Sequence, residues 1–207
     1  MKTYNAESGR SMIEMLGVLA IIGVLSVGGI AGYSKAMMKY RVNKTIEQIT
    51  LIAGNVRAFF ASQKNYEDIK DYGASGDKND VKTILKKAKL VPDEMWNEDE
   101  INSVYGSGVY IFSDHSNPKA FYLSFSDIPE EACVSLVSHD WPNETQGILF
   151  GNLDSLGSSN MQPYGICNYR EKGLYSVCRD DLPVSVDDAV EGCTCTNSLC
   201  AITFVFK

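Results

Sequence analysis

Residues 11–33 read SMIEMLGVLAIIGVLSVGGIAGY and form a long apolar stretch near the start of the chain. From Met15 to Ser34 no charged residue occurs over 20 positions. As an α-helix, such a run spans ~30 Å, about one hydrocarbon thickness of a bilayer. One carboxylate, Glu14, stands near its start, and a charged side chain inside a membrane segment is unfavourable by ~2.5–3.5 kcal/mol on insertion scales. The stretch therefore predicts a membrane helix in which Glu14 has a function.

A plain signal anchor and a cleaved secretory signal are the alternatives for this stretch. The cleaved signal fits poorly, because the leading residues MKTYNAESG are weakly basic, the apolar run is long and no A-x-A site follows it. Glu14 lies only one turn into the stretch, so the alternative for its carboxylate is to snorkel to the membrane interface. Gly28 and Gly29 form a weak point at which the helix can open or bend.

Apolar residues continue at helical spacing beyond the membrane run. The stripe consists of Val42, Ile46, Ile49, Ala53, Val56 and Phe60. No proline occurs before Pro92, so we expect one helix from about Met12 to about Ser62. Its first half is apolar all round and its second half is amphipathic. This pattern predicts a first half buried in lipid or in other subunits, and a second half packed on a globular head.

The N-terminus resembles that of type IV prepilins and pseudopilins. The resemblance covers about 35 residues and rests on Gly9-Arg-Ser-Met-Ile-Glu14 followed by the long apolar helix. It implies that an inner-membrane prepilin peptidase cuts between Gly9 and Arg10 and N-methylates the new amine. Glu14 is then the fifth mature residue and meets the N-terminal amine of a neighbouring subunit during assembly. The family usually has Phe, Met or Leu after the cut, whereas this chain has Arg10.

The remainder of the chain predicts a compact head of helices and antiparallel strands, an α+β fold. We expect helices over Asp80–Leu90, Pro129–His139 and Val186–Val190, with Cys133, Leu136 and Val137 of the second helix facing inward. We expect strands over Ser103–Phe112, Lys119–Phe125, Gln146–Gly151 and Leu199–Phe206, the last with Ile202, Phe204 and Phe206 on one face. Tyr164–Tyr169 and Gly173–Arg179 are expected to pair through a turn at Arg170-Glu-Lys.

All six cysteines lie in the last 75 residues of the chain. An even number downstream of a membrane segment favours disulfides in an oxidising compartment. Zinc is the rival interpretation, but Cys193-Thr-Cys195 lacks the usual ligand spacing, and neither His115 nor His139 lies near the cysteines in sequence. Spacing alone leaves all fifteen pairings open.

Three short segments of the head resemble the PilS-like branch of type IVb pilins. They are Ile128-Pro-Glu-Glu-Ala-Cys133, Ala189-Val-Glu-Gly-Cys193 and Ile202-Thr-Phe. The resemblance implies the pilin fold, a long N-terminal helix packed on an antiparallel β-sheet head with a disulfide-bonded C-terminal region. It also implies the disulfides Cys133–Cys193, Cys167–Cys178 and Cys195–Cys200. The expected organisation is a leader over 1–9, a membrane or filament-core half-helix over 10–34, an amphipathic half-helix over 35–62 and the head over 63–207.

Catalysis and nucleic-acid binding are not expected. The chain has two isolated histidines and lacks the G-x-S-x-G, phosphate-loop and H-E-x-x-H motifs, so we expect no catalytic residue, no cofactor and no metal. Residues 1–62 carry seven Lys/Arg and three Asp/Glu, and the remaining residues carry twelve and twenty-three. A head that is strongly acidic is a poor match for nucleic acid.

The expected function is that of a structural subunit of a bacterial type IV pilus. Its partners are then further copies of itself, the prepilin peptidase, the assembly platform and ATPase, and the membrane before assembly. The precursor is expected in the inner membrane with a periplasmic head, and the product in an extracellular pilus. Lys35, Lys39, Arg41 and Lys44 would place the head in the cytoplasm by the positive-inside rule, but the cysteines favour the oxidising side.

Three alternatives to a pilus subunit remain open from the sequence. The nearest is a pseudopilin of a type II secretion system. Another is an anchored extracytoplasmic binding domain that never polymerises. The last is an anchored enzyme, which is disfavoured because no catalytic site is visible.

Overall fold

The computed structural model describes residues 8–63, 65–69, 81–114, 117–152, 169–171 and 174–207. The chain divides into two compact units, Met1–Tyr40 and Arg41–Lys207. Helix α1 (Ser8–Phe60) begins in the first unit and ends in the second, so the predicted long helix is confirmed with slightly shifted ends. Every described side chain of the first unit from Met12 to Ala36 is exposed.

The part of α1 in the second unit buries one face in the head. Most of the predicted stripe is buried, namely Val42, Ile49, Ala53, Val56 and Phe60, whereas Ile46 is only half-buried. Two polar side chains, Thr45 and Gln48, are also buried on this face. The Thr45 hydroxyl donates to the Arg41 carbonyl at 2.9 Å, and Gln48 Nε2 lies 3.5 Å from Glu94 Oε1, whereas Gln48 Oε1 is buried without a hydrogen-bond partner among the described residues.

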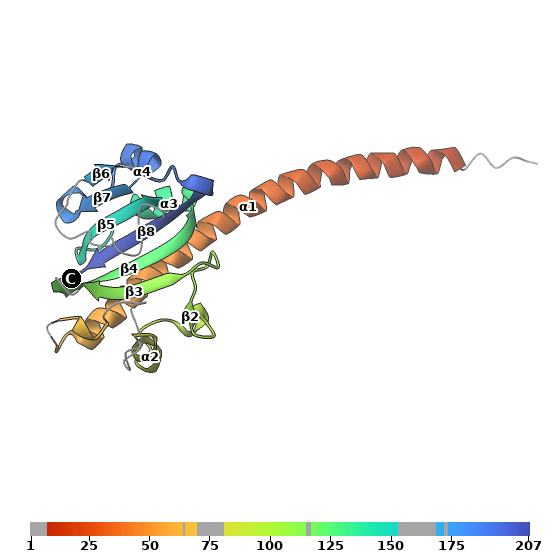
Figure 1. The fold of residues 1–207 in the computed structure, drawn as a ribbon. Coiled ribbons are helices and arrows are strands. Elements are labelled where there is room, and N and C mark those ends of the chain that lie inside the picture. The colour runs from red at the N-terminus through yellow and green to blue at the C-terminus, as the bar shows by residue number, and fades with distance from the viewer. Residues whose placement is uncertain (1–7, 64, 70–80, 115–116, 153–168, 172–173) are drawn as a thin grey trace, which may run out of the picture. The chain divides into compact units, whose positions relative to one another are not determined.

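Within the described residues, six antiparallel strands form the main sheet, in the order β3-β4-β8-β5-β7-β6 (Figure 1). In chain order they are β3 (Val109–Asp114), β4 (Asn117–Pro129), β5 (Thr145–Asn152), β6 (Tyr169–Glu171), β7 (Leu174–Cys178) and β8 (Leu199–Phe206). The last strand therefore lies in the middle of the sheet, between β4 and β5. This placement ties the C-terminal segment to the centre of the head.

Aromatic side chains form much of the core around β8. Ile202, Phe204 and Phe206 are buried, as predicted. The Phe121 and Phe206 rings stack with centroids 5.3 Å apart, and the Trp141 ring meets Phe204 at 4.7 Å. Such pairs contribute beyond their buried area by about 0.5–1.5 kcal/mol each.

The two helices of the C-terminal half lie close to their predicted positions. Helix α3 (Glu130–Val137) follows Pro129, carries acidic residues in its first turn and buries Cys133, Leu136 and Val137, as expected. Helix α4 (Val186–Gly192) begins after Ser185, whose hydroxyl accepts a hydrogen bond from the Asp188 backbone N–H at 3.2 Å. It extends two residues further than predicted.

Several shorter elements complete the head. They are α2 (Val81–Lys87), the short strands β1 (Trp96–Asn97) and β2 (Glu100–Ile101), and the 3₁₀ turns η1 (Glu67–Ile69), η2 (Asp93–Met95), η4 (Arg179–Asp181) and η5 (Thr196–Ser198). Helix α2 is shorter than the expected Asp80–Leu90, and Lys89 has a φ of 51° shortly after its end.

Two strand predictions were partly wrong. The strand expected over Ser103–Phe112 begins only at Val109, because Gly106 at φ 82° lies in a tight turn closed by a Gly106 N–H to Ser103 carbonyl hydrogen bond. The β6–β7 hairpin exists, but Arg170 and Glu171 belong to strand β6 rather than to the turn, and Glu171 pairs with Leu174. Residues 164–168, expected in the first strand of this pair, lie outside the described residues.

Candidate assembly helix and disulfide-bonded C-terminal region

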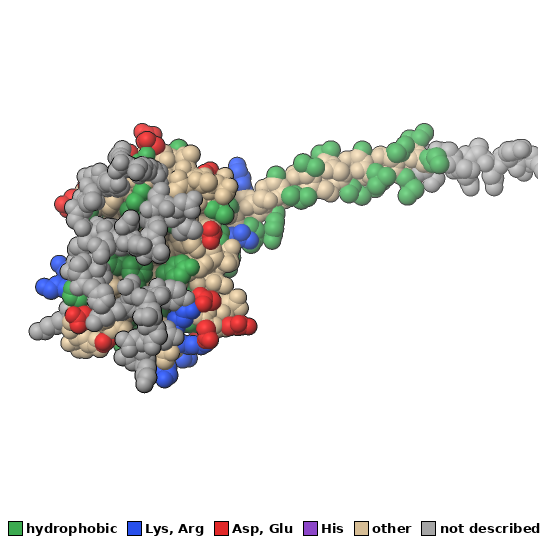
Figure 2. Space-filling model, viewed as in Figure 1, with side chains coloured by type: hydrophobic (Ala, Val, Ile, Leu, Met, Phe, Trp, Pro, Cys, Tyr) green, Lys and Arg blue, Asp and Glu red, His purple; other side chains and the backbone are tan. Residues whose placement is uncertain are grey.

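The first unit presents an apolar helix to its surroundings. In the described residues, α1 is the one helix long and apolar enough to cross a membrane, and its most apolar stretch is not buried at all. Figure 2 shows hydrophobic side chains along both visible edges of this helix. An exposed apolar surface of this extent marks a segment that is covered by lipid or by other protein chains.

The residues singled out in the sequence lie on this helix. The backbone of Gly9 and Arg10 belongs to its first turn, and Glu14 follows one turn later among exposed apolar neighbours, Ile13 at 74% and Met15 at 65%. Helix α1 continues without a break through Gly28 and Gly29, and nothing lies within 4 Å of a Cβ added at either position. The predicted weak point is therefore helical in this structure.

A charged cluster attaches the second half of α1 to the segment that follows α2. Lys44 Nζ lies 2.9 Å from Glu94 Oε1 and 3.2 Å from Glu47 Oε2. The hydrogen bond from Lys44 lowers the pKa of Glu94, and the hydrogen bonds to Glu94 and Glu47 raise the pKa of Lys44. These contacts hold the turn η2 against the helix.

A second cluster attaches α1 to the residue that follows β8 and to the residue that precedes β5. Arg57 Nε donates to the main-chain oxygen of Lys207 at 3.0 Å, and Arg57 Nη1 lies 3.4 Å from Glu144 Oε1. A backbone hydrogen bond lowers the pKa of Glu144, and the charge of Arg57 lowers this pKa further. Burial raises the pKa of Tyr66, and Arg57 partly opposes this effect.

The structure contains two of the three disulfides that the resemblance implied. Cys133–Cys193 joins α3 to the residue after α4 with a Cα–Cα distance of 5.8 Å, and Cys195–Cys200 closes the η5 loop at 5.4 Å. The third pair, Cys167–Cys178, involves Cys167, which lies outside the described residues.

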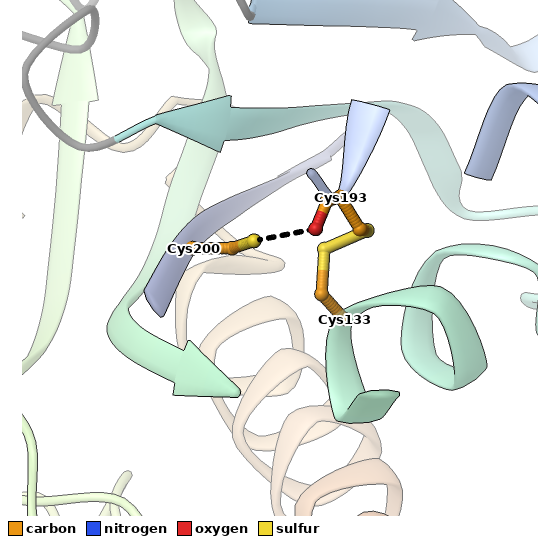
Figure 3. A group of neighbouring side chains, drawn as sticks. All are labelled: Cys133, Cys193 and Cys200. Carbon is orange, nitrogen blue, oxygen red and sulfur yellow. Dashed lines mark hydrogen bonds between the residues drawn. A yellow bond between two sulfur atoms is a disulfide. The ribbon is translucent and has the colours of Figure 1, made fainter. Parts of the chain in front are cut away.

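Sequence reasoning missed how closely the two disulfides approach each other. The Sγ atoms of Cys133, Cys193 and Cys200 all lie within 4.8 Å of one another, although they come from α3, the end of α4 and β8 (Figure 3). This spacing would suit a metal, but a metal ligand must be a thiolate and each of these sulfurs is in a disulfide. Only the fold could reveal this juxtaposition, since Cys133 is 60 residues from Cys193.

Among the described residues, the one histidine, His139, packs against a tryptophan. His139 is half-buried and its ring meets Trp141 edge-on, with centroids 4.9 Å apart. Trp141 in turn donates from Nε1 to the Leu136 carbonyl at 2.8 Å, so this pair packs the end of α3. His115 lies outside the described residues.

Comparison with known families decides between the remaining interpretations. Residues 39–152, more than half of the chain, match the family described as PilS N terminal. The chain belongs to the PilS family of type IVb pilins. As a pilin it is a structural subunit and not an enzyme, and the family's assemblies are pili.

A solved structure supports the pilin fold. TcpA, a type IV pilin from Vibrio cholerae El Tor biotype, matches 81% of this pilin and 99% of its own chain, with 14% identity and a TM-score of 0.51. A type IVb pilin from Salmonella typhi covers 74% of this chain and 91% of its own, with 15% identity and a TM-score of 0.45. A search of curated proteins finds no match. At these identities, the TcpA match supports the fold alone.

Proposed function

We propose that this pilin is made as a membrane precursor, is cut between Gly9 and Arg10, and polymerises through α1 into a type IVb pilus. The observation that carries the proposal is the change of character along α1. Its side chains are exposed and largely apolar from Met12 to Ala36, whereas from Val42 to Phe60 one face is buried in the head. A helix of this kind suits a subunit whose first half is covered by lipid before assembly and by neighbouring helices afterwards.

Glu14 has a chemical role in this proposal. A carboxylate in an apolar bundle is stable only beside a cation, because its loss of hydration must be offset by a close opposite charge. Cutting after Gly9 creates a new amine at Arg10, four residues from Glu14 on the same chain. The amine of an adjacent subunit would supply the cation, so that each added subunit satisfies one charge pair. N-methylation leaves this amine protonated, so it can still act as the cation that pairs with Glu14.

The partners and location follow from the same proposal. The precursor sits in the inner membrane with its head in the periplasm, where disulfides are stable. A prepilin peptidase, an assembly platform and an ATPase act on it there, and the mature subunits form an extracellular filament. The leader is then 1–9, the filament-core half-helix 10–34, the amphipathic half 35–62 and the head 63–207.

Processing can be tested directly by mass. The full-length chain is expressed with and without a prepilin peptidase, and its intact mass and N-terminal sequence are determined. We expect loss of MKTYNAESG and a new N-terminus at Arg10, with the mass of one added methyl group. Gly9→Ala should block the cut, while Gly17→Ala, in the same helix, should leave it unchanged. A wild-type chain that keeps its full mass would contradict the proposal and favour a permanently anchored domain.

A further inference from the structure

The three buried sulfurs lie where one disulfide can exchange with the other. Cys133, Cys193 and Cys200 are 0%, 1% and 0% exposed, and their Sγ atoms lie within 4.8 Å of one another. Figure 3 shows the Cys200 sulfur pointing toward the Cys133–Cys193 bond, with the Cys193 carbonyl oxygen 3.4 Å from it. We propose that this group is a disulfide-exchange centre, in which opening of Cys195–Cys200 lets Cys200 replace Cys193 as the partner of Cys133.

The surrounding loop directs an external thiol to one end of the local disulfide. Cys195 is 9% exposed and Cys200 is fully buried, and the residues between them, Thr196–Leu199, are all exposed. A thiolate from solvent would reach the Cys195 sulfur when this exposed loop opens, and it would do so more readily there than at the Cys200 sulfur, whose residue has no exposed surface. Thiol–disulfide exchange depends on such access and on which sulfur is attacked. Attack at Cys195 releases Cys200 as the thiolate, next to the second disulfide.

The backbone keeps the released thiolate in place. Cys200 lies in β8 and pairs with Ile128 of β4 on one side and Asn152 of β5 on the other. The Cys195 backbone N–H donates to Glu130 Oε1 at 2.8 Å, and the Thr196 backbone N–H donates to the Asn152 side chain. These contacts do not depend on the Cys195–Cys200 bond. The Cys200 sulfur therefore remains within reach of Cys133, which makes the exchange effectively intramolecular.

The steps balance with an external dithiol as the reductant. One of its thiolates attacks Cys195 Sγ, forms a mixed disulfide and displaces the Cys200 thiolate. Its second thiol then resolves the mixed disulfide, which leaves Cys195 as a thiol and the reductant oxidised. The Cys200 thiolate attacks Cys133 Sγ, forms Cys133–Cys200 and releases the Cys193 thiolate, which takes up a proton. The chain has gained two electrons and two protons in total.

The exchange would preserve the covalent attachment of α3. Helix α3 packs against both α4 and β8, so a Cys133–Cys200 bond fits the same neighbourhood as the Cys133–Cys193 bond. The disulfide that closes the exposed loop is then the one that is lost under reduction, while α3 stays linked to the C-terminal region. This device acts in the single chain and does not depend on whether filaments form.

Two matched variants of the full-length protein in detergent test the proposal. Cys195→Ser leaves Cys200 as a permanent thiol, and Cys200→Ser leaves Cys195, which lies outside the group of three sulfurs. Each variant is labelled with N-ethylmaleimide under acid quench, digested and mapped by tandem mass spectrometry. In Cys195→Ser we expect a Cys133–Cys200 link, with label on Cys193 as well as on Cys200. In Cys200→Ser we expect an intact Cys133–Cys193 link and label on Cys195.

Wild-type protein under limited dithiothreitol provides a measurement that does not require either variant to fold. Alkylation at the stage where two thiols have appeared should place label on Cys195 and on both Cys200 and Cys193, with linked Cys133–Cys200 peptides present. Label confined to Cys195 and Cys200, or the appearance of labelled Cys133, would overturn the proposed exchange. In Cys195→Ser, label on Cys200 alone would also overturn the proposed exchange. Label on Cys133 in that variant would overturn it as well.

Discussion

The ammonium group of Lys44 on α1 lies 2.9 Å from the carboxylate of Glu94 in η2, 50 residues further along the chain. This contact joins the amphipathic half of the helix to the segment between α2 and the sheet. Gln48 Nε2 approaches the same carboxylate at 3.5 Å, so two α1 residues converge on Glu94. The pair therefore marks where α1 and the connecting region are fastened to each other.

We expect acid to weaken the head through this contact. The pKa of Glu94 is lowered in the folded protein by Lys44, so its contribution is present above the ordinary glutamate pKa of about 4.3 and is lost as pH falls through the folded pKa. The pKa of Glu144 is also lowered, so it contributes in the same window. The pKa of Lys44 is raised, so its contribution is lost only as pH rises through an alkaline pKa.

Urea unfolding between pH 3 and pH 7, about the range of carboxyl titration, measures this effect. Glu94→Gln should reduce the acid-dependent loss of stability without abolishing it, because Glu144 is retained. Glu98→Gln, at an exposed carboxylate four residues away, is the control and should leave the slope unchanged. If the free energy of unfolding falls equally with decreasing pH in Glu94→Gln and in the wild type, this account of the Lys44–Glu94 pair is contradicted.

Gly192 is predicted to be intolerant of a side chain. A Cβ at this position would overlap Phe150 Cε2 and lie 2.8 Å from Tyr175 Cγ, where α4 meets the sheet. Gly192→Ala should therefore lower the free energy of unfolding by about 1–3 kcal/mol through overpacking. Gly54→Ala, on exposed helix with nothing within 4 Å of the new Cβ, should be neutral or stabilising by up to about 1 kcal/mol. Chemical denaturation followed by circular dichroism compares the free energy of unfolding of the two variants. Equal changes in the two variants would refute the close packing around Gly192.

The two described disulfides should differ in their effect on stability. Cys133–Cys193 spans 60 residues and Cys195–Cys200 spans 5. In the chain-entropy model, replacing both cysteines of the long link by serine lowers the free energy of unfolding by about 4 kcal/mol, against about 2 kcal/mol for the short link. Denaturant unfolding of the two double variants measures the difference. A larger loss from the short link would contradict the predicted order.

The bend expected at Gly28 and Gly29 can be examined through assembly. Alanine is more helix-favouring than glycine by about 1 kcal/mol per site, so Gly28→Ala with Gly29→Ala should stiffen the helix. If filament formation requires this segment to open, the double variant should be processed normally but yield fewer filaments. Gly17→Ala with Gly23→Ala is the control pair on the same helix. Equal yields from both pairs would show that Gly28 and Gly29 have no special role.

The sequence predicted the elements whose periodicity is strong. The uncharged run and the apolar stripe placed α1 nearly to its ends, and the alternation around Ile202, Phe204 and Phe206 placed β8. The length of β4 was underestimated because its pairing with β8 continues past a bulge, with Asp127 at φ 49° between Phe125 and Ile128. Local propensity contains no sign of such a bulge.

Tertiary contacts account for the other differences between the sequence-based predictions and the structure. Gln48 has a polar side chain, which in a helix usually faces solvent. Its burial accompanies a contact with Glu94, which lies 46 positions away. The approach of Cys200 to Cys133 and Cys193 likewise depends on β8 entering the middle of the sheet beside α3 and α4. By contrast, the expected roles of Gly9, Arg10 and Glu14 rest on the resemblance to prepilins and stay predictions, because the proposed processing signal would be read by another protein and its recognition needs no folded context.

Filament assembly through Glu14 is the central claim, and electron microscopy of filaments from peptidase-processed full-length protein tests it most directly. Glu14→Ala should be cut after Gly9 like the wild type but should form few or no filaments. Glu47→Ala, which removes an exposed carboxylate from the same helix, should form filaments in normal yield. Abundant filaments from Glu14→Ala, or none from the processed wild-type chain in the presence of an assembly platform and ATPase, would contradict the account.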